Sequence, residues 1–149
     1  MKPIRTWILV ADGARARFLE NHGPGKGLEA ALDSEMQQHL PPNRELVTDK
    51  PGRGSSPASG GRHAVAPRTD WHTFEKERFA HQVAETLDHA RTEGRFDRLV
   101  LVAPPKTLGW LREQLSKPTY AKVTGEIAKD LTNASDADLK EQLGAVMAI

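Results

Sequence analysis

A strongly helical segment that leads directly into a short apolar run constrains the fold of this chain more than any other feature. Between Trp71 and Arg95, apolar side chains recur every three or four residues and form one stripe, made of Phe79, Val83, Leu87 and Ala90. The run Leu99–Ala103 follows, and its unbroken apolar character is typical of a strand buried on both faces of a sheet. A long helix followed by such a strand predicts an α/β domain.

Local signals set the expected ends of this helix. Asp70 is a typical N-cap residue, and Gly94 ends the apolar pattern. Glu75 and Glu77 would then lie in the early turns, where the helix dipole favours carboxylates. We therefore expect a helix from near Trp71 to near Gly94.

The N-terminal part of the chain predicts a β-hairpin. The apolar run Trp7–Ala11 is closed by Asp12-Gly13, a strong turn signal between strand-like segments. After the turn, apolar residues alternate with basic ones, so Arg15 and Arg17 share one face of the expected second strand.

Four further segments complete the expected secondary structure. Leu28–Gln37 is ambiguous, because its composition favours a helix while its position after a turn-rich stretch favours a strand. Leucines at positions 108, 111 and 115 predict a short helix that Pro118 terminates. Val123–Leu131 predicts a strand at the sheet edge, and Ser135 is the expected N-cap of a last helix. The apolar stripe of that helix consists of Leu139, Leu143, Val146 and Met147.

Length and composition favour a single domain over residues 1–149, since a chain of this size with 38% hydrophobic residues can bury one core. No apolar run approaches the roughly 20 residues of a membrane helix, so we expect no membrane insertion. Asp12 interrupts the N-terminal apolar stretch too early for a signal peptide. The sequence has no cysteine, which excludes disulfides and thiolate chemistry, and the expected location is cytoplasmic.

The segment Lys50–Thr69 is rich in glycine, proline and serine and carries a concentrated positive charge. It has four basic residues and no acidic one, while the whole chain has a net charge of only +1. Long loops of this kind are either linkers or functional arms. We interpret this one as a flexible arm that contacts phosphates, although a solvated loop that binds nothing has the same composition. The expected binding residues, including a second basic surface on the hairpin, are Arg53, Gly60, Gly61, Arg62, Arg68, Arg15 and Arg17.

Other chemistry is not indicated. A metal site built from Asp12, Asp70, Glu75 and Asp97 is conceivable, but Asp12 is better explained as a turn residue and Asp70 as a helix cap. The six histidines do not cluster in sequence, so we assign no metal and no cofactor. The loop serines lack a Gly-x-Ser-x-Gly elbow, and no phosphate-binding P-loop pattern occurs, so no catalytic residue is assigned.

Four segments, in this order, resemble the bacterial host-attachment protein family. They are WILVADGARARFLE, SGGRHAVAPRTDWHTFEKERFAHQVAETL, FDRLVLVAPPK and VTGEIAKDLTN. The resemblance covers nearly the whole chain, and the family in turn resembles the central domain of archaeal and eukaryotic class I peptide-release factors. It implies a three-layer α/β/α domain with a mixed sheet, in which Leu28–Gln37 is a strand.

The resemblance also bears on function. Release factors act through a Gly-Gly-Gln tip, whereas this chain has Gly60-Gly61-Arg62 at the comparable place. Arginine offers only donors and a charge, while glutamine also offers an acceptor, so we expect no hydrolysis and a non-enzymatic protein. Two functions remain open. One is an intracellular module whose basic loop contacts RNA or the ribosome, and the other is a protein-interaction or surface-attachment factor that mediates bacterial attachment to host cells.

Overall fold

Strand β1 (Thr6–Ala11) lies inside a mixed six-stranded sheet, and all of its residues are buried. The computed structural model describes residues 4–32, 35–38 and 65–149, with side chains in the long helix described from residue 72 onward. Strand β2 (Arg15–Asn21) pairs with β1 in the antiparallel sense, and β5 (Arg98–Val102) pairs with it in parallel on the other side. The remaining strands are β3 (Glu29–Ala30), β4 (Met36–Gln37) and β6 (Val123–Ile127). The order is β3-β2-β1-β5-β6, and β4 also pairs with β2.

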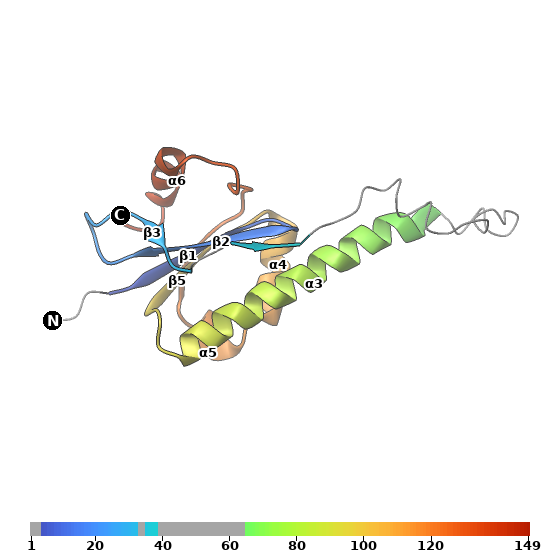
Figure 1. Ribbon diagram of the computed structural model, residues 1–149, viewed down its shortest axis with the longest axis horizontal. Coiled ribbons are helices and arrows are strands. Elements are labelled where there is room, and N and C mark those ends of the chain that lie inside the picture. Colours follow the sequence, from blue (N-terminus) through green and yellow to red (C-terminus); the bar gives the residue numbers. More distant parts are fainter. Residues whose placement is uncertain (1–3, 33–34, 39–64) are drawn as a thin grey trace, which may run out of the picture.

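Helices cover both faces of this sheet (Figure 1). They are α3 (Val65–Thr92), α4 (Pro105–Gln114), α5 (Lys117–Tyr120) and α6 (Asp136–Leu143). Helices α3 and α4 bury one face, and α6 covers the other. The three-layer α/β/α arrangement with a mixed sheet confirms the fold expected from the sequence. Within the described ranges, no helix has the length and apolar character needed to cross a membrane.

Alternation along β1 explains why the domain has a core on each side of the sheet. Trp7 and Leu9 point toward α3, whereas Ile8 and Val10 point toward α6. The helical stripe expected from the sequence is confirmed, since Phe79, Val83, Leu87 and Ala90 are all buried against the first of these faces. The apolar run in β5 is likewise buried on both faces.

The turn between β1 and β2 follows the sequence prediction. Asp12 Oδ1 accepts hydrogen bonds of 2.8 Å from the backbone N–H groups of Ala14 and Arg15, as turn aspartates do. A Cβ atom at Gly13 would lie 2.6 Å from Cγ of Lys76, so a larger residue there would displace the Lys76 side chain. The absence of a side chain at Gly13 therefore allows α3 to pack closely over the hairpin turn at Lys76.

Helix α3 begins earlier than the sequence predicted. It starts at Val65 rather than near Trp71, so Asp70 is inside the helix and is not its N-cap. Pro67 is compatible with this start, because the first four N–H groups of a helix lack intrahelical partners in any case. Glu75 and Glu77 consequently lie well away from the helix N-terminus, so the helix dipole does not stabilise them there as expected. The expected end is confirmed, since Gly94 has a φ of +71° just beyond the helix.

The ambiguous segment 28–37 is not a helix. It contains the two short strands β3 and β4 instead of one continuous strand, with Ala30 opposite Leu19 and Met36 opposite Ala16. Ala31, Leu32 and Met36 pack against the core on the α3 face. Pairing with β2 and burial thus outweigh the helical propensity of these residues.

In the C-terminal helices, two features differ from the sequence prediction and one agrees with it. Helix α4 ends at Gln114, and Pro118 lies in the first turn of α5, where its missing N–H costs little. Ser135 caps α6 as predicted, because its side chain accepts a hydrogen bond from the N–H of Asp138. Helix α6 ends at Leu143, so Val146 and Met147 pack on the second core from beyond the helix.

Strand β6 is at the sheet edge, as predicted, and Glu126 ties it to α4 and α5. Glu126 accepts hydrogen bonds of 2.8 Å from Arg112 Nε and 2.8 Å from the Tyr120 hydroxyl. Burial raises the pKa of Glu126, but the hydrogen bonds from Arg112 and Tyr120 and the Arg112 charge outweigh it, so the pKa lies below its ordinary value. Ionised Glu126 therefore stabilises the fold above its unfolded pKa, and this contribution is lost as the pH falls through the folded pKa.

We expect the Glu126→Gln variant to lack this contribution. The difference in unfolding free energy between the wild type and the variant should be largest near pH 6 and should shrink as the pH is lowered toward about 3. Urea denaturation across this pH range measures the difference. The exposed Glu113→Gln on α4 is the control, and a pH dependence as large in that variant would contradict the role of Glu126.

Candidate functional site

Most of the residues predicted to form the site precede α3 in the sequence or lie in its first turns. Arg53, Gly60, Gly61 and Arg62 lie outside the described residues. Arg68 lies within α3 and not in a loop, as the sequence had suggested, because the helix begins at Val65. Figure 1 shows that α3 runs along the sheet and extends beyond its end, so that the first turns of the helix project from the body of the domain.

Contacts at residues 75 and 76 hold this projecting helix at its base. The side-chain Nε2 of Gln38 donates a hydrogen bond of 2.8 Å to the backbone carbonyl of Glu75. The backbone N–H of Gln38 donates one of 2.7 Å to the backbone carbonyl of Ala14. The Lys76 stem lies over Gly13 at the hairpin turn. Phe74, immediately before these anchors, has 57% of its surface exposed. The helix therefore leaves the body at a defined point.

Arg15 and Arg17 lie on the opposite face of the sheet, where they contact the segment before α6. Arg15 donates to the side-chain oxygen of Asn133 and, at 3.4 Å, to the Thr132 carbonyl. Arg17 is within 3.6 Å of a carboxylate oxygen of Glu35 and of Asp136, and its side chain is only 19% exposed. The structure thus does not bring these two arginines together with the projecting end of α3. Their described contacts join β2 to residues 132–136 and to Glu35.

Two of the carboxylates considered for a metal site, Asp12 and Asp97, do not meet. Asp12 follows β1, where its second oxygen, Oδ2, lies 3.1 Å from the Thr132 hydroxyl. Asp97 precedes β5, which runs parallel to β1, and accepts a hydrogen bond of 2.8 Å from the backbone N–H of Arg5. The two groups therefore lie at opposite ends of the parallel pair.

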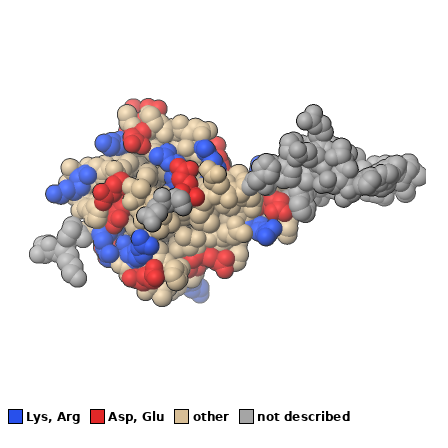
Figure 2. Space-filling view, viewed as in Figure 1, with Lys and Arg blue, Asp and Glu red and all other residues tan. Residues whose placement is uncertain are grey.

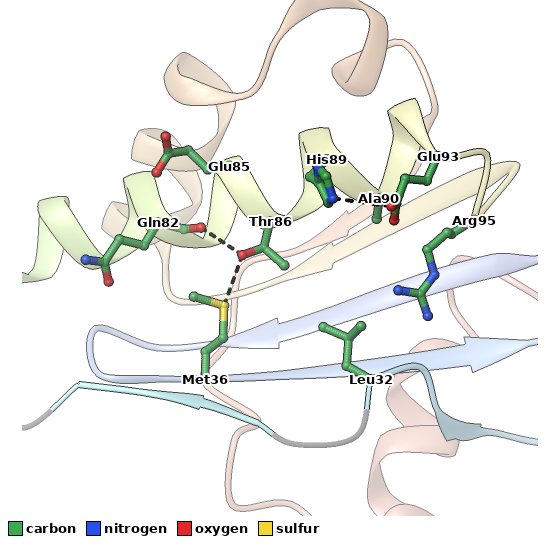
Figure 3. Close-up of a pocket in the computed structure, with 9 residues that line it drawn as sticks. All are labelled: Leu32, Met36, Gln82, Glu85, Thr86, His89, Ala90, Glu93 and Arg95. Carbon is green, nitrogen blue, oxygen red and sulfur yellow. Dashed lines mark hydrogen bonds and ion pairs between the residues drawn. The ribbon is translucent and has the colours of Figure 1, made fainter.

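A groove of about 650 Å³ lies between α3 and the β3–β4 region (Figure 3). Leu32, Met36 and Ala90 supply apolar surface, and polar side chains stand along its sides, among them His89 and Glu93, whose Nε2 and Oε2 atoms are 3.3 Å apart. The Thr86 hydroxyl lies 3.1 Å from the Gln82 carbonyl one turn earlier, an ordinary arrangement for a helical threonine. The groove thus offers a surface for binding and no nucleophile activated by a base among the side chains that line it.

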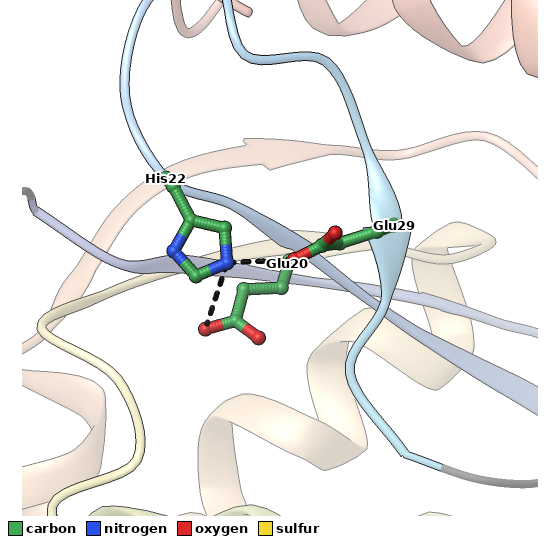
Figure 4. Close-up of side chains that lie close together, drawn as sticks. All are labelled: Glu20, His22 and Glu29. Carbon is green, nitrogen blue, oxygen red and sulfur yellow. Dashed lines mark hydrogen bonds and ion pairs between the residues drawn. The ribbon is translucent and has the colours of Figure 1, made fainter.

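One cluster of potential metal ligands was missed by the sequence reasoning. Glu20, His22 and Glu29 converge where β2 ends and β3 begins (Figure 4). The spacing of Glu20 and His22 was an available signal, because residues two apart on an extended chain point to the same side. Glu29 could be added only once its partner strand was known.

Comparison with known proteins yields a family and a likeness to solved structures. A family model described as "Protein required for attachment to host cells" matches residues 7–143, in agreement with the resemblance seen in the sequence. The crystal structure of the archaeal translation termination factor aRF1 is similar with a TM-score of 0.48 and 10% sequence identity, over 95% of this chain. The chain spans 38% of the length of that factor. No curated protein matches the sequence.

Proposed function

Because the chain belongs to the family of proteins required for attachment to host cells, we propose that it serves attachment as a non-enzymatic module that binds RNA through residues 50–68. The charge of this segment supports the proposal, since it holds Lys50, Arg53, Arg62 and Arg68 and no acidic residue. Such a segment gains affinity for a phosphate backbone by releasing counterions. RNA free in solution and RNA in the ribosome present the same backbone.

The position of the segment in the sequence favours the same function. It leads into α3, whose first turns project from the body. On the face of the body shown in Figure 2, acidic and basic side chains are interspersed, so neither sign dominates there. A phosphate backbone is therefore attracted to the projecting end more than to this face.

Arg15 and Arg17 contribute less in this proposal than Arg53, Arg62 and Arg68. Arg17 is close to two carboxylates and is mostly buried, so binding a phosphate would require it to leave both partners. We propose instead that these two arginines stabilise the packing of residues 132–136 against β2.

Replacing Arg53, Arg62 and Arg68 together by Ala should weaken binding to RNAs of different sequence alike, because phosphate contacts do not read bases. The slope of log affinity against log salt should flatten by roughly 2–3, near one unit for each lost contact. Filter-binding titrations between low and physiological salt measure both effects.

The matched control removes the same charge elsewhere, by replacing the exposed Lys26, Lys117 and Lys140 with Ala. This variant should keep nearly all of the affinity. The RNA proposal fails if the wild type shows no affinity at low salt, or if both variants weaken binding equally.

Hydrolysis of peptidyl-tRNA is expected to be absent in the wild type, because Arg62 stands where release factors have glutamine. We place the action of the protein in the cytoplasm, where RNA is accessible.

The description of the family also fits a protein-interaction or surface-attachment factor. Capture from a lysate with and without ribonuclease separates the two, since partners that remain after ribonuclease treatment favour the protein alternative.

A further inference from the structure

Two carboxylates face each other across the short pairing of β2 with β3. Glu20 and Glu29 are directly opposite in the antiparallel register, and His22 lies beside them (Figure 4). His22 Nε2 is 2.7 Å from Glu29 Oε1 and 3.8 Å from Glu20 Oε2. Like charges directly opposite each other weaken a strand pair. The arrangement is therefore favourable when a cation lies between the carboxylates.

The loop that follows β2 holds His22 in place. Asn21 is only 2% exposed, its Nδ2 donates a hydrogen bond of 2.7 Å to the Gly27 carbonyl, and its Oδ1 accepts one of 3.0 Å from the Gly23 N–H. Gly23 and Gly27 have φ values of +129° and +73°, which residues with a side chain rarely adopt. The backbone on both sides of His22 is thus determined by the local sequence.

We propose that Glu20, His22 and Glu29 bind one Zn²⁺ ion. One atom from each side chain lies within 4.8 Å of the other two. Zinc bonds of about 2.0–2.2 Å to imidazole nitrogen and carboxylate oxygen place tetrahedral ligand atoms about 3.3 Å apart. The distances from His22 Nε2 to the two carboxylate oxygens, 2.7 and 3.8 Å, lie on either side of that value. Small side-chain rotations would therefore bring the ligand atoms to the separation that zinc requires.

The donor types decide the choice of metal. An imidazole with two carboxylates suits zinc, whereas magnesium and calcium prefer oxygen ligands only. Three protein ligands leave a fourth position for water. The ion would join β3, a strand of only two residues, to β2, and this site is independent of the proposed RNA binding.

Isothermal titration of the metal-stripped full chain with zinc chloride tests the site. The wild type should bind about one equivalent, and Glu20→Gln, His22→Gln and Glu29→Gln should each weaken that binding at least tenfold, as the loss of a ligand requires. Magnesium chloride should not compete. Circular dichroism establishes that each variant is folded.

The matched control is the double variant His89→Gln, Glu93→Gln, which removes a neighbouring histidine and glutamate at the C-terminal end of α3. It should bind zinc as the wild type does, and zinc should raise its thermal midpoint but not that of His22→Gln. The proposal is overturned if no zinc binds, if Glu29→Gln binds as tightly as the wild type, or if the control loses as much affinity as the three variants. In the first case, His22 serves only as a hydrogen-bond partner of Glu29.

Discussion

Replacing Trp7 by Ala is expected to lower the free energy of unfolding by about 3–5 kcal/mol, the usual range for a buried tryptophan. Trp7 is 1% exposed and lies at the centre of an aromatic cluster, with its ring centroid 6.2 Å from that of Phe18 and 5.3 Å from that of Phe96. The Arg95 guanidinium covers its face at 5.3 Å. Truncation leaves a cavity that these neighbours cannot fill without moving. Chemical denaturation with urea measures the loss.

The Trp7→Phe variant separates ring packing from the polar atom of the indole. Trp7 Nε1 is buried and has no hydrogen-bond partner among the described residues. Phenylalanine keeps a ring against Phe18 and Phe96 and removes this unpaired donor, which offsets part of the lost volume. We expect a loss of only about 1–2 kcal/mol. A loss as large as that of Trp7→Ala would show that the cluster requires the full indole.

Replacing Leu87 by Ala is expected to cost about 2–5 kcal/mol, because Leu87 is fully buried in the stripe by which α3 packs on the sheet. The control is Ile4→Ala, which removes the same number of carbon atoms from a side chain in a residue that is 42% exposed. The control should lose much less stability, within about 0.5 kcal/mol for a surface position. Equal losses in the two variants would contradict the assignment of the buried face of α3.

Much of the fold could be predicted because the relevant signals are local. The spacing from Phe79 to Ala90 identified the buried face of α3, and Asp12-Gly13 identified the hairpin turn. Ser135 identified the start of α6 through a bond to a residue only three positions away. Each of these signals is a property of a few neighbouring residues, which behave similarly in many folds.

The candidate site was predicted only as a distribution of charge. The sequence shows where Arg53 and Arg62 stand and that no acidic residue accompanies them. It did not show that Arg68 belongs to a helix, because Asp70 offered an equally ordinary place for α3 to begin. Nor did it show that the side chains of Arg15 and Arg17 contact other residues of the same chain.

By itself, the sequence determined the α/β class, the buried stripe of α3, the first hairpin and the concentration of positive charge before α3. Only the tertiary structure decided that residues 28–37 form two short strands against their helical propensity, since the pairing with β2 outweighs it. It also decided that Arg15 contacts Thr132, 117 positions away, and that Glu29 lies opposite Glu20. Such contacts depend on how distant segments pack together, and no local pattern of residues specifies that packing.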